Sequence, residues 1–195
     1  MASTKREFDE TAALDAAMRV FWQHGYRNST MGMLCSAMGL MPQSVYLWMG
    51  DKKNLFTACV RHYREALMPD LVLEMARDGA DGLHSVDRLL KMWADWATHP
   101  DCNGCLITLG LSEFGDSDPE ILGALLEFED TVRRGLEKAL EKAARSGELK
   151  PDVTPKSAAR LLLTVHKGLM VGGRAGSVEG ALETVRLLRS ALMTS

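Results

Sequence analysis

The chain has 195 residues, of which 46% are hydrophobic and 25% are charged, and its formal net charge is −3 at pH 7. This length suits one domain, or a small module joined to a larger one, and the composition excludes collagen-like, disordered and disulfide-scaffold proteins. No apolar run reaches the roughly 18 residues that a membrane span needs. The first ten residues lack an apolar core, so we expect no signal peptide, a cytoplasmic protein and four free cysteine thiols.

The charge is unevenly distributed along the chain. Residues 1–68 carry 8 Lys and Arg against 6 Asp and Glu, whereas residues 69–195 carry 15 against 20. The N-terminal third is therefore slightly basic and the remainder is acidic. Because an acidic surface opposes non-specific adhesion to DNA, any contact with DNA has to be local to the N-terminal part.

Helix-forming residues dominate, and strand signals are nearly absent, because Val, Ile and Thr rarely alternate with polar residues. Gly, Pro, Asp and Ser divide the chain into about nine helical segments. In chain order, we expect them near residues 5–24, 31–38, 42–49, 52–77, 83–98, 104–114, 118–146, 155–175 and 178–193. The predicted fold is all-α, with an N-terminal three-helix helix-turn-helix head and a C-terminal helical bundle body.

The first three segments have the punctuation of a helix-turn-helix. The first stops at Gly25, a residue type that commonly follows a helix C-terminus. Thr30 is placed to cap the second segment, which ends at Gly39, and Pro42 takes the favoured first position of the third. Two short helices joined by a glycine-containing turn and supported by a longer helix form a helix-turn-helix.

The run FWQHGYRNSTMGMLCSAMGLMPQSVYLWMGDKKNLF resembles the DNA-binding head of the tetracycline-repressor (TetR) family. The matching elements are Phe21, Gly25-Tyr26, Thr30, Leu34, Gly39-Leu40, Val45-Tyr46, Asp51-Lys52 and Leu55. The resemblance implies a DNA-binding domain at 1–51 and a helical ligand-binding and dimerisation domain at 52–195, whose last two long helices build the dimer. The implied function is a ligand-responsive transcriptional repressor that binds a pseudo-palindromic DNA operator as a homodimer and is released by a small-molecule inducer.

The resemblance also implies roles for residues of the head. Thr30 begins the second helix, where a hydroxyl and backbone N–H groups can meet a phosphate. Gln43 and Ser44 fall in the first turn of the recognition helix, where side chains reach base edges. The remaining expected contacts are with the sugar-phosphate backbone and come from Tyr46, Trp48 and Lys52.

Several residues of the head depart from the family pattern, among them Gly32 and Cys35, which stand where polar or alanine residues are usual. Met38 stands where a small residue is usual, and Met41 stands where a capping Ser or Thr is usual. The recognition helix is therefore expected to lack a side-chain N-cap, at a cost of about 1 kcal/mol. Core packing is the alternative role for Tyr46 and Trp48, and a solvated charge is the alternative for Lys52.

The body supplies candidates for a ligand pocket. In the family, the corresponding helices surround an inducer cavity, and the residues that fall on them here are Trp93, Trp96, Phe128, His166 and Met170. Aromatic and Met side chains suit a pocket for apolar ligands. For any one of these residues core packing is the simpler explanation, and His166 also fits a core or interface histidine.

The segment HPDCNGCLI holds the one reactive-looking group of residues in the sequence. Cys102 and Cys105 have C-x-x-C spacing, and Cys105 follows Gly104 at a helix start, where a thiol gains nucleophilicity. Family members that sense electrophiles or oxidants have a similar GCL stretch, so thiol sensing is one role and inert packing is the other. A zinc site needs about four ligands, and this segment offers only three, one His and the two Cys. We therefore expect no metal and no other cofactor.

Two other functions remain as alternatives. One is a helical small-molecule-binding or thiol-sensing adaptor that has lost specific DNA binding, given Met38 and Met41. The other is an all-helical enzyme using Cys102 and Cys105. Because no carboxylate pair, Ser-His-Asp set or phosphate-binding glycine loop supports catalysis, we do not expect an enzyme.

Overall fold

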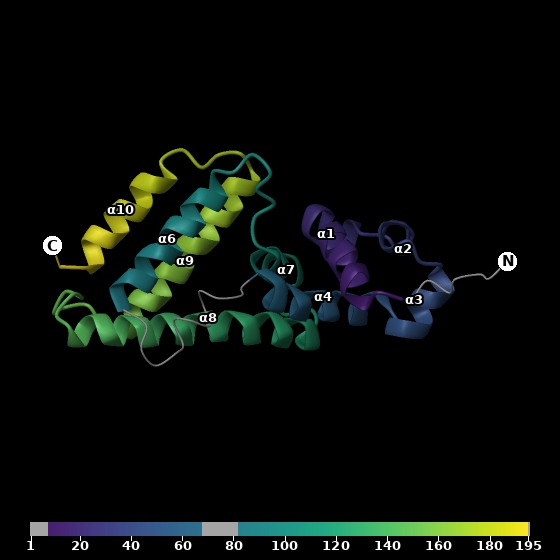
Figure 1. The fold of residues 1–195 in the computed structure, drawn as a ribbon, viewed down its shortest axis with the longest axis horizontal. Coiled ribbons are helices and arrows are strands. Elements are labelled where there is room, and N and C mark those ends of the chain that lie inside the picture. Colours follow the sequence, from purple (N-terminus) through teal and green to yellow (C-terminus); the bar gives the residue numbers. More distant parts are fainter. Residues whose placement is uncertain (1–7, 68–81, 195) are drawn as a thin grey trace.

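The computed structural model describes residues 8–67 and 82–194. Within these ranges its helices are α1 (Glu10–Asn28), α2 (Met31–Met38), α3 (Pro42–Met49), α4 (Lys52–Leu67), α6 (Gly82–Ala97), α7 (Leu106–Phe114), α8 (Pro119–Arg145), α9 (Pro155–Arg174) and α10 (Ala181–Leu192). The all-α class is confirmed, and each expected segment overlaps one of these helices. Figure 1 shows α1 to α3 at one end of an elongated molecule and α6, α9 and α10 at the other.

The helix bounds differ from the expected ones for local reasons. α1 begins at Glu10, and not near residue 5, because the Asp9 carboxylate accepts the N–H of Ala12 (3.0 Å) and caps the helix there. Gly25 does not end α1 but kinks it, with φ 76° and ψ 171°, and one further helical turn follows. The start of the first expected segment at 5–7 and the end of the fourth at 68–77 lie outside the described residues.

The head has a small apolar core of its own. One side chain from each helix, Phe21 of α1, Leu34 of α2 and Val45 of α3, is almost fully buried. The first turns of α4 close this core with Leu55 and Phe56. Because α4 also packs on α7 and α8, it belongs to the head at one end and to the body at the other.

The body is a helical bundle built on amphipathic helices. In α6, Val86, Leu89, Leu90 and Trp93 are buried at the spacing of three and four residues that places side chains on one helix face. α6 lies between α9 and α10, and the long α8 runs along the base of this layer (Figure 1). Among the described residues, no helix has the length and apolar character needed to cross a bilayer.

Candidate functional site

α2 and α3 form a tight helix-turn-helix. Thr30 Oγ1 accepts the N–H of Met33 (3.2 Å) and caps the start of α2. Gly39 ends α2 in the left-handed conformation (φ 66°), and the next N–H, that of Leu40, returns to the carbonyl of Cys35 (3.0 Å). A residue with a Cβ would be strained at Gly39. This closed turn fixes the angle at which α3 leaves α2.

Val45 is the one fully buried side chain of α3, and the side chains of its first turn face solvent. Val45 is 1% exposed, whereas Gln43, Ser44 and Tyr46 are all exposed. Met41 makes no side-chain hydrogen bond to the start of α3, which confirms the expected missing cap. The side chains expected to reach bases and backbone are therefore free to do so.

Trp48 is placed differently from its neighbours on α3. It is half-buried, and its ring meets the ring of Phe8 edge-on, with centroids 4.8 Å apart. This arrangement favours a packing role for Trp48, in which the indole joins α3 to the residues that precede α1.

Positive charge near α3 is scarce. Residues 28–50 contain no Asp, Glu, Lys, Arg or His. The Lys52 ammonium lies 4.3 Å from the centre of the Tyr26 ring, and partial burial of the amine lowers its pKa. Lys53 is engaged by the body, because hydrogen bonds with Glu120 (2.8 Å) and Asp118 (3.0 Å) raise its pKa to about 12. Lys53 is therefore held by acidic groups of the body, whereas Lys52 makes a cation–π contact within the head.

The kink in α1 creates four unpaired backbone groups. In an unbroken helix the N–H groups of Tyr26 and Arg27 would donate to the carbonyls four residues earlier. Gly25 breaks that pattern, and the two N–H groups instead donate to Glu113 near the end of α7, at 2.7 Å and 2.5 Å. A carboxylate of the body thus accepts the two hydrogen bonds that the kinked helix cannot form within the head.

The two carbonyls released by the kink are also satisfied from the body. Arg174, the last residue of α9, donates to the carbonyls of Trp22 (2.8 Å) and Gln23 (2.7 Å). The Trp22 indole N–H donates to the carbonyl of Gly104 (3.2 Å), which also accepts the indole N–H of Trp96 (3.0 Å). The end of α1 is therefore clamped between α7 and α9.

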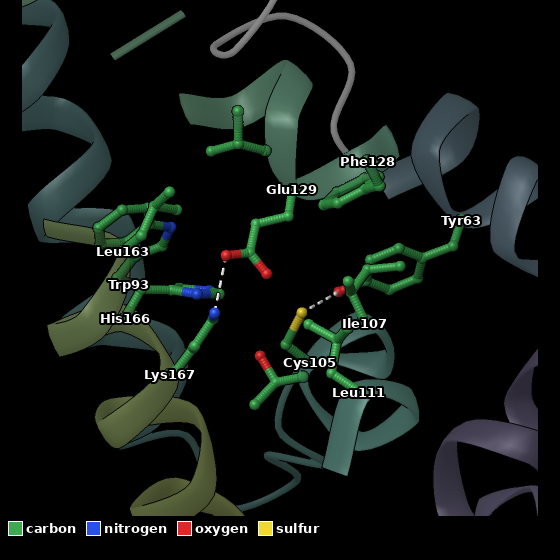
Figure 2. Close-up of a pocket in the computed structure, with 12 residues that line it drawn as sticks. Tyr63, Trp93, Cys105, Ile107, Leu111, Phe128, Glu129, Leu163, His166 and Lys167 are labelled. Carbon is green, nitrogen blue, oxygen red and sulfur yellow. Dashed lines mark hydrogen bonds and ion pairs between the residues drawn. The ribbon is translucent and has the colours of Figure 1, made fainter. Parts of the chain in front are cut away.

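A cavity lies between α4, α6, α7, α8 and α9, with an empty volume of about 460 Å³ including its solvent-filled mouth (Figure 2). The lining is mostly apolar and consists of Tyr63, Trp93, Cys105, Ile107, Thr108, Leu111, Phe128, Glu129, Val132, Leu163, His166 and Lys167.

The structure brings together three of the five residues expected at a ligand pocket. Trp93, Phe128 and His166 line the cavity (Figure 2). Trp96 lies outside its wall, where it bonds the loop before α7, and Met170 is buried in the core.

The cavity also contains polar groups that the sequence analysis missed. Lys167 Nζ lies 2.7 Å from Glu129 Oε1 (Figure 2). Lys167 follows His166 in the sequence, and Glu129 follows Phe128. The sequence could have pointed to these two polar residues only if the orientation of each helix had been known. The His166 ring lies 4.5 Å from the Trp93 ring, and burial, together with the charge of Lys167, lowers the pKa of His166 to about 4. Its imidazole is therefore neutral at pH 7.

The two cysteines of the C-x-x-C pair are both buried and free but have different surroundings. Cys105 lines the cavity, and its sulfur accepts the hydroxyl of Tyr63 (3.7 Å), whose pKa is raised chiefly by burial (Figure 2). Cys102 does not line it, and its sulfur accepts the N–H of Gly104 (3.4 Å). No group of three or more His, Cys, Asp or Glu in the described residues is arranged to hold a metal ion.

A helix-turn-helix head clamped to an all-helical body with a cavity defines a DNA-binding regulator. The family model described as "Bacterial regulatory proteins, tetR family" matches residues 13–59. The model described as "Tetracyclin repressor-like, C-terminal domain" matches residues 82–190. The chain therefore belongs to the TetR family and is a transcriptional regulator.

Individual relatives match most of the chain. The transcriptional repressor AcnR of Corynebacterium diphtheriae is 25% identical over 190 residues, which are 95% of this chain and 93% of AcnR. The transcriptional repressor ComR of Escherichia coli is 24% identical over 171 residues, 87% of this chain and 81% of ComR. A cysteine mutant of the TetR-family regulator CifR, complexed with 26-bp double-strand operator DNA, is 26% identical with a TM-score of 0.82, and the match covers 95% of this chain and 98% of CifR.

Proposed function

We propose that this regulator represses transcription by binding a pseudo-palindromic operator as a homodimer, and that a small molecule in the cavity releases it. The observation that carries the proposal is α3, which is anchored by Val45 and exposes Gln43 and Ser44. In such a dimer the two α3 helices lie about 34–36 Å apart, in successive major grooves. Similarity to CifR, a regulator whose structure was determined on operator DNA, supports the same mode of binding.

Within this proposal the exposed residues of the head divide into two groups. Gln43 and Ser44 read base edges, since an amide can pair with adenine N6 and N7 and a hydroxyl with several edges. Thr30, Tyr46 and Lys52 hold backbone phosphates, with Thr30 acting at the positive end of α2. Trp48 supports α3 from behind, through Phe8.

The second copy of the chain is proposed to pair through α9 and α10. Four exposed large apolar side chains lie on these two helices, namely Leu161, Val171, Leu182 and Leu187. At Gly168 of α9 a Cβ would meet nothing within 4 Å, so the backbone there is open to close approach. A two-fold pairing of identical helices buries such a surface on both copies at once.

The effector is proposed to be a mostly apolar molecule with one or two polar groups. Trp93 and Phe128 offer aromatic contacts, and the neutral His166 offers a hydrogen bond. The first turns of α7 line the cavity, and Glu113 near its end holds the kinked end of α1. A ligand that moves α7 therefore also moves the head, to the extent that it binds one arrangement better than the other.

The thiols are proposed as a second input, because Cys105 lines the cavity. An electrophile or oxidant that enters the cavity would reach this sulfur, and adding bulk there would act on α7 as an apolar ligand does. Alkylation of the wild type and of Cys105→Ser, followed by operator titration, tests this. Equal affinities before and after treatment in both proteins would leave Cys102 and Cys105 as packing residues. We propose no catalytic role for either cysteine.

We also propose that the protein is located in the cytoplasm, because its proposed DNA target is there.

The experiment that tests the proposed function is selection of bound duplexes from a random oligonucleotide pool by the full-length protein. We expect an enriched pseudo-palindrome whose half-sites are one helical turn apart. Gln43→Ala should then lose about 1–3 kcal/mol on that operator and relax the preference at one base pair. If the wild type bound the selected duplexes no better than scrambled DNA, the adaptor function would replace the repressor function.

A further inference from the structure

The most exposed large apolar side chain of the described residues lies on the recognition helix. Leu47 of α3 is 82% exposed, and Met41, immediately before α3, is 72% exposed. A singly exposed leucine is ordinary on a protein surface, so exposure alone carries no conclusion. The inference depends instead on which face of α3 carries Leu47.

Leu47 shares a face with the proposed base reader Gln43. The two residues are four positions apart, so their side chains are neighbours along one side of the helix. Val45 lies midway between them in sequence and points the opposite way, into the core of the head. Leu47 is therefore one turn further along the face that α3 presents away from the protein. In a helix-turn-helix that face enters the major groove.

The chemistry of this face selects one kind of base pair. Because residues 28–50 carry no charged side chain, α3 has neither an Arg or Lys for guanine O6 and N7 nor an Asp or Glu for cytosine N4. What it exposes is an amide, hydroxyls and apolar groups. An amide suits adenine, and an apolar side chain suits the C5 methyl group of thymine. Both preferences point to A·T pairs.

We propose that Leu47 is a base-reading residue that packs against thymine C5 methyl groups, next to the adenine that Gln43 reads. This inference rests on the proposed function, since it requires α3 to lie in the major groove. Met41 is a second apolar side chain at the end of α3 where the first bases are met. Each operator half-site then carries at least one thymine opposite Leu47 whose methyl group contributes to affinity.

The test uses the operator obtained by selection and the full-length protein. Each thymine is replaced in turn by deoxyuridine, which pairs identically but lacks the methyl group. Replacing the thymine opposite Leu47 in one half-site should weaken binding about fourfold, as expected for one apolar carbon removed from contact. Thymines outside the half-sites should show no effect.

The variant Leu47→Ala links this loss to the side chain. It should bind the thymine operator more weakly than wild type does and should no longer distinguish thymine from deoxyuridine at that position. Leu47→Met should keep the distinction. Leu126→Ala, which removes another exposed leucine from α8, is the matched control and should behave as wild type. Because Leu47 is exposed, its truncation should leave the melting temperature unchanged.

The outcomes separate this inference from the proposed function. If no duplex is selected over scrambled DNA, the proposed function fails, and the inference fails with it. If an operator is selected but has no thymine in the half-site, or tolerates deoxyuridine at every position, the proposed function stands and the inference fails. Full sensitivity to deoxyuridine in Leu47→Ala would assign the methyl contact to another residue and also overturn the inference.

Discussion

Lys52 shows how much of the DNA affinity one side chain of this head is expected to carry. The described neighbours Arg27 and Lys53 are directed to carbonyl or carboxylate oxygens of the body, whereas the Lys52 ammonium lies over the Tyr26 ring of α1. With so few cations, the dependence of affinity on salt should be modest for a protein of this class.

Lys52→Ala should weaken binding to operator and to scrambled DNA by the same factor, because a phosphate contact carries no sequence information. The slope of log affinity against log salt concentration should fall by about one unit. Titrations at several salt concentrations measure both quantities. Lys91→Ala, on the outer face of α6, is the control and should change neither. A loss confined to the operator would contradict the phosphate role.

His166 should make the stability of the fold depend on pH. Its pKa is about 4 in the folded protein, whereas an unperturbed histidine has a pKa near 6.5. The unfolded chain therefore binds a proton more readily, and the free energy of unfolding decreases as pH falls through about 6.5 towards 4. At pH 5 this contribution should lower it by about 2 kcal/mol relative to pH 7.5.

Urea unfolding of wild type and His166→Asn at both pH values, at one protein concentration, measures this contribution. Because the two proteins differ only at this residue, the difference between their pH dependences isolates the imidazole. The variant should lose about 2 kcal/mol less on acidification. Equal losses would mean that His166 becomes protonated in the folded state without cost.

Among the elements, the kink of α1 ties the head to the body. The two N–H groups released at Gly25 bond Glu113 of α7, and the two carbonyls released bond Arg174 of α9. Side chains of the body therefore satisfy the backbone groups that the kink leaves without helical partners. Because Glu113 of α7 is one of these partners, we expect a movement of α7 to shift the end of α1.

Glu113→Ala should destabilise the protein by about 1–3 kcal/mol, because the N–H groups of Tyr26, which is partly buried, and of Arg27 lose their acceptor. Hydrogen exchange at Tyr26 and Arg27 should accelerate, and chemical unfolding should report the energy. Glu113→Gln keeps an acceptor oxygen and should lose less. Glu141→Ala, at an exposed position of α8, controls for the loss of a negative charge. Unchanged exchange at both amides in Glu113→Ala would show that solvent replaces the carboxylate.

The elements that local chemistry determines are the ones that could be predicted. α2 and α3 begin and end at the expected residues, because Thr30, Gly39, Pro42 and Gly50 act on their own neighbours in sequence. The partners of the α1 kink could not be predicted in this way. Glu113 is 87 residues from Tyr26, and only the packing of the body brings them together.

The lining of the cavity could also be predicted only in part from the sequence. Trp93 and Trp96 lie three residues apart on one apolar side of α6, so helical periodicity assigns them almost the same face. Of the two, only Trp93 lines the cavity, and the indole N–H of Trp96 donates instead to the carbonyl of Gly104 in the loop before α7. Met170 follows His166 by one turn of α9 but is buried in the core beyond the cavity wall.

At the scale of the whole molecule, affinity depends on holding two heads at one fixed separation. One head has a single short recognition helix and little positive charge, so we expect it to bind DNA weakly by itself. A dimer makes the second contact intramolecular, and that contact then forms at a high effective concentration. The acidic body keeps non-specific attraction to DNA low, which leaves the paired geometry to provide specificity.

Leu187→Glu should therefore abolish operator binding without unfolding the chain. Leu187 is 65% exposed on α10, so a charge there costs the single copy little, whereas in the proposed interface it would be buried without a partner. Light scattering should give the mass of two chains for wild type and of one chain for the variant, and operator affinity should fall about 100-fold or more. Leu126→Glu places the same charge on α8, outside the proposed interface, and should remain dimeric with wild-type affinity. A Leu187→Glu protein that stays dimeric on the operator would move the interface away from α10.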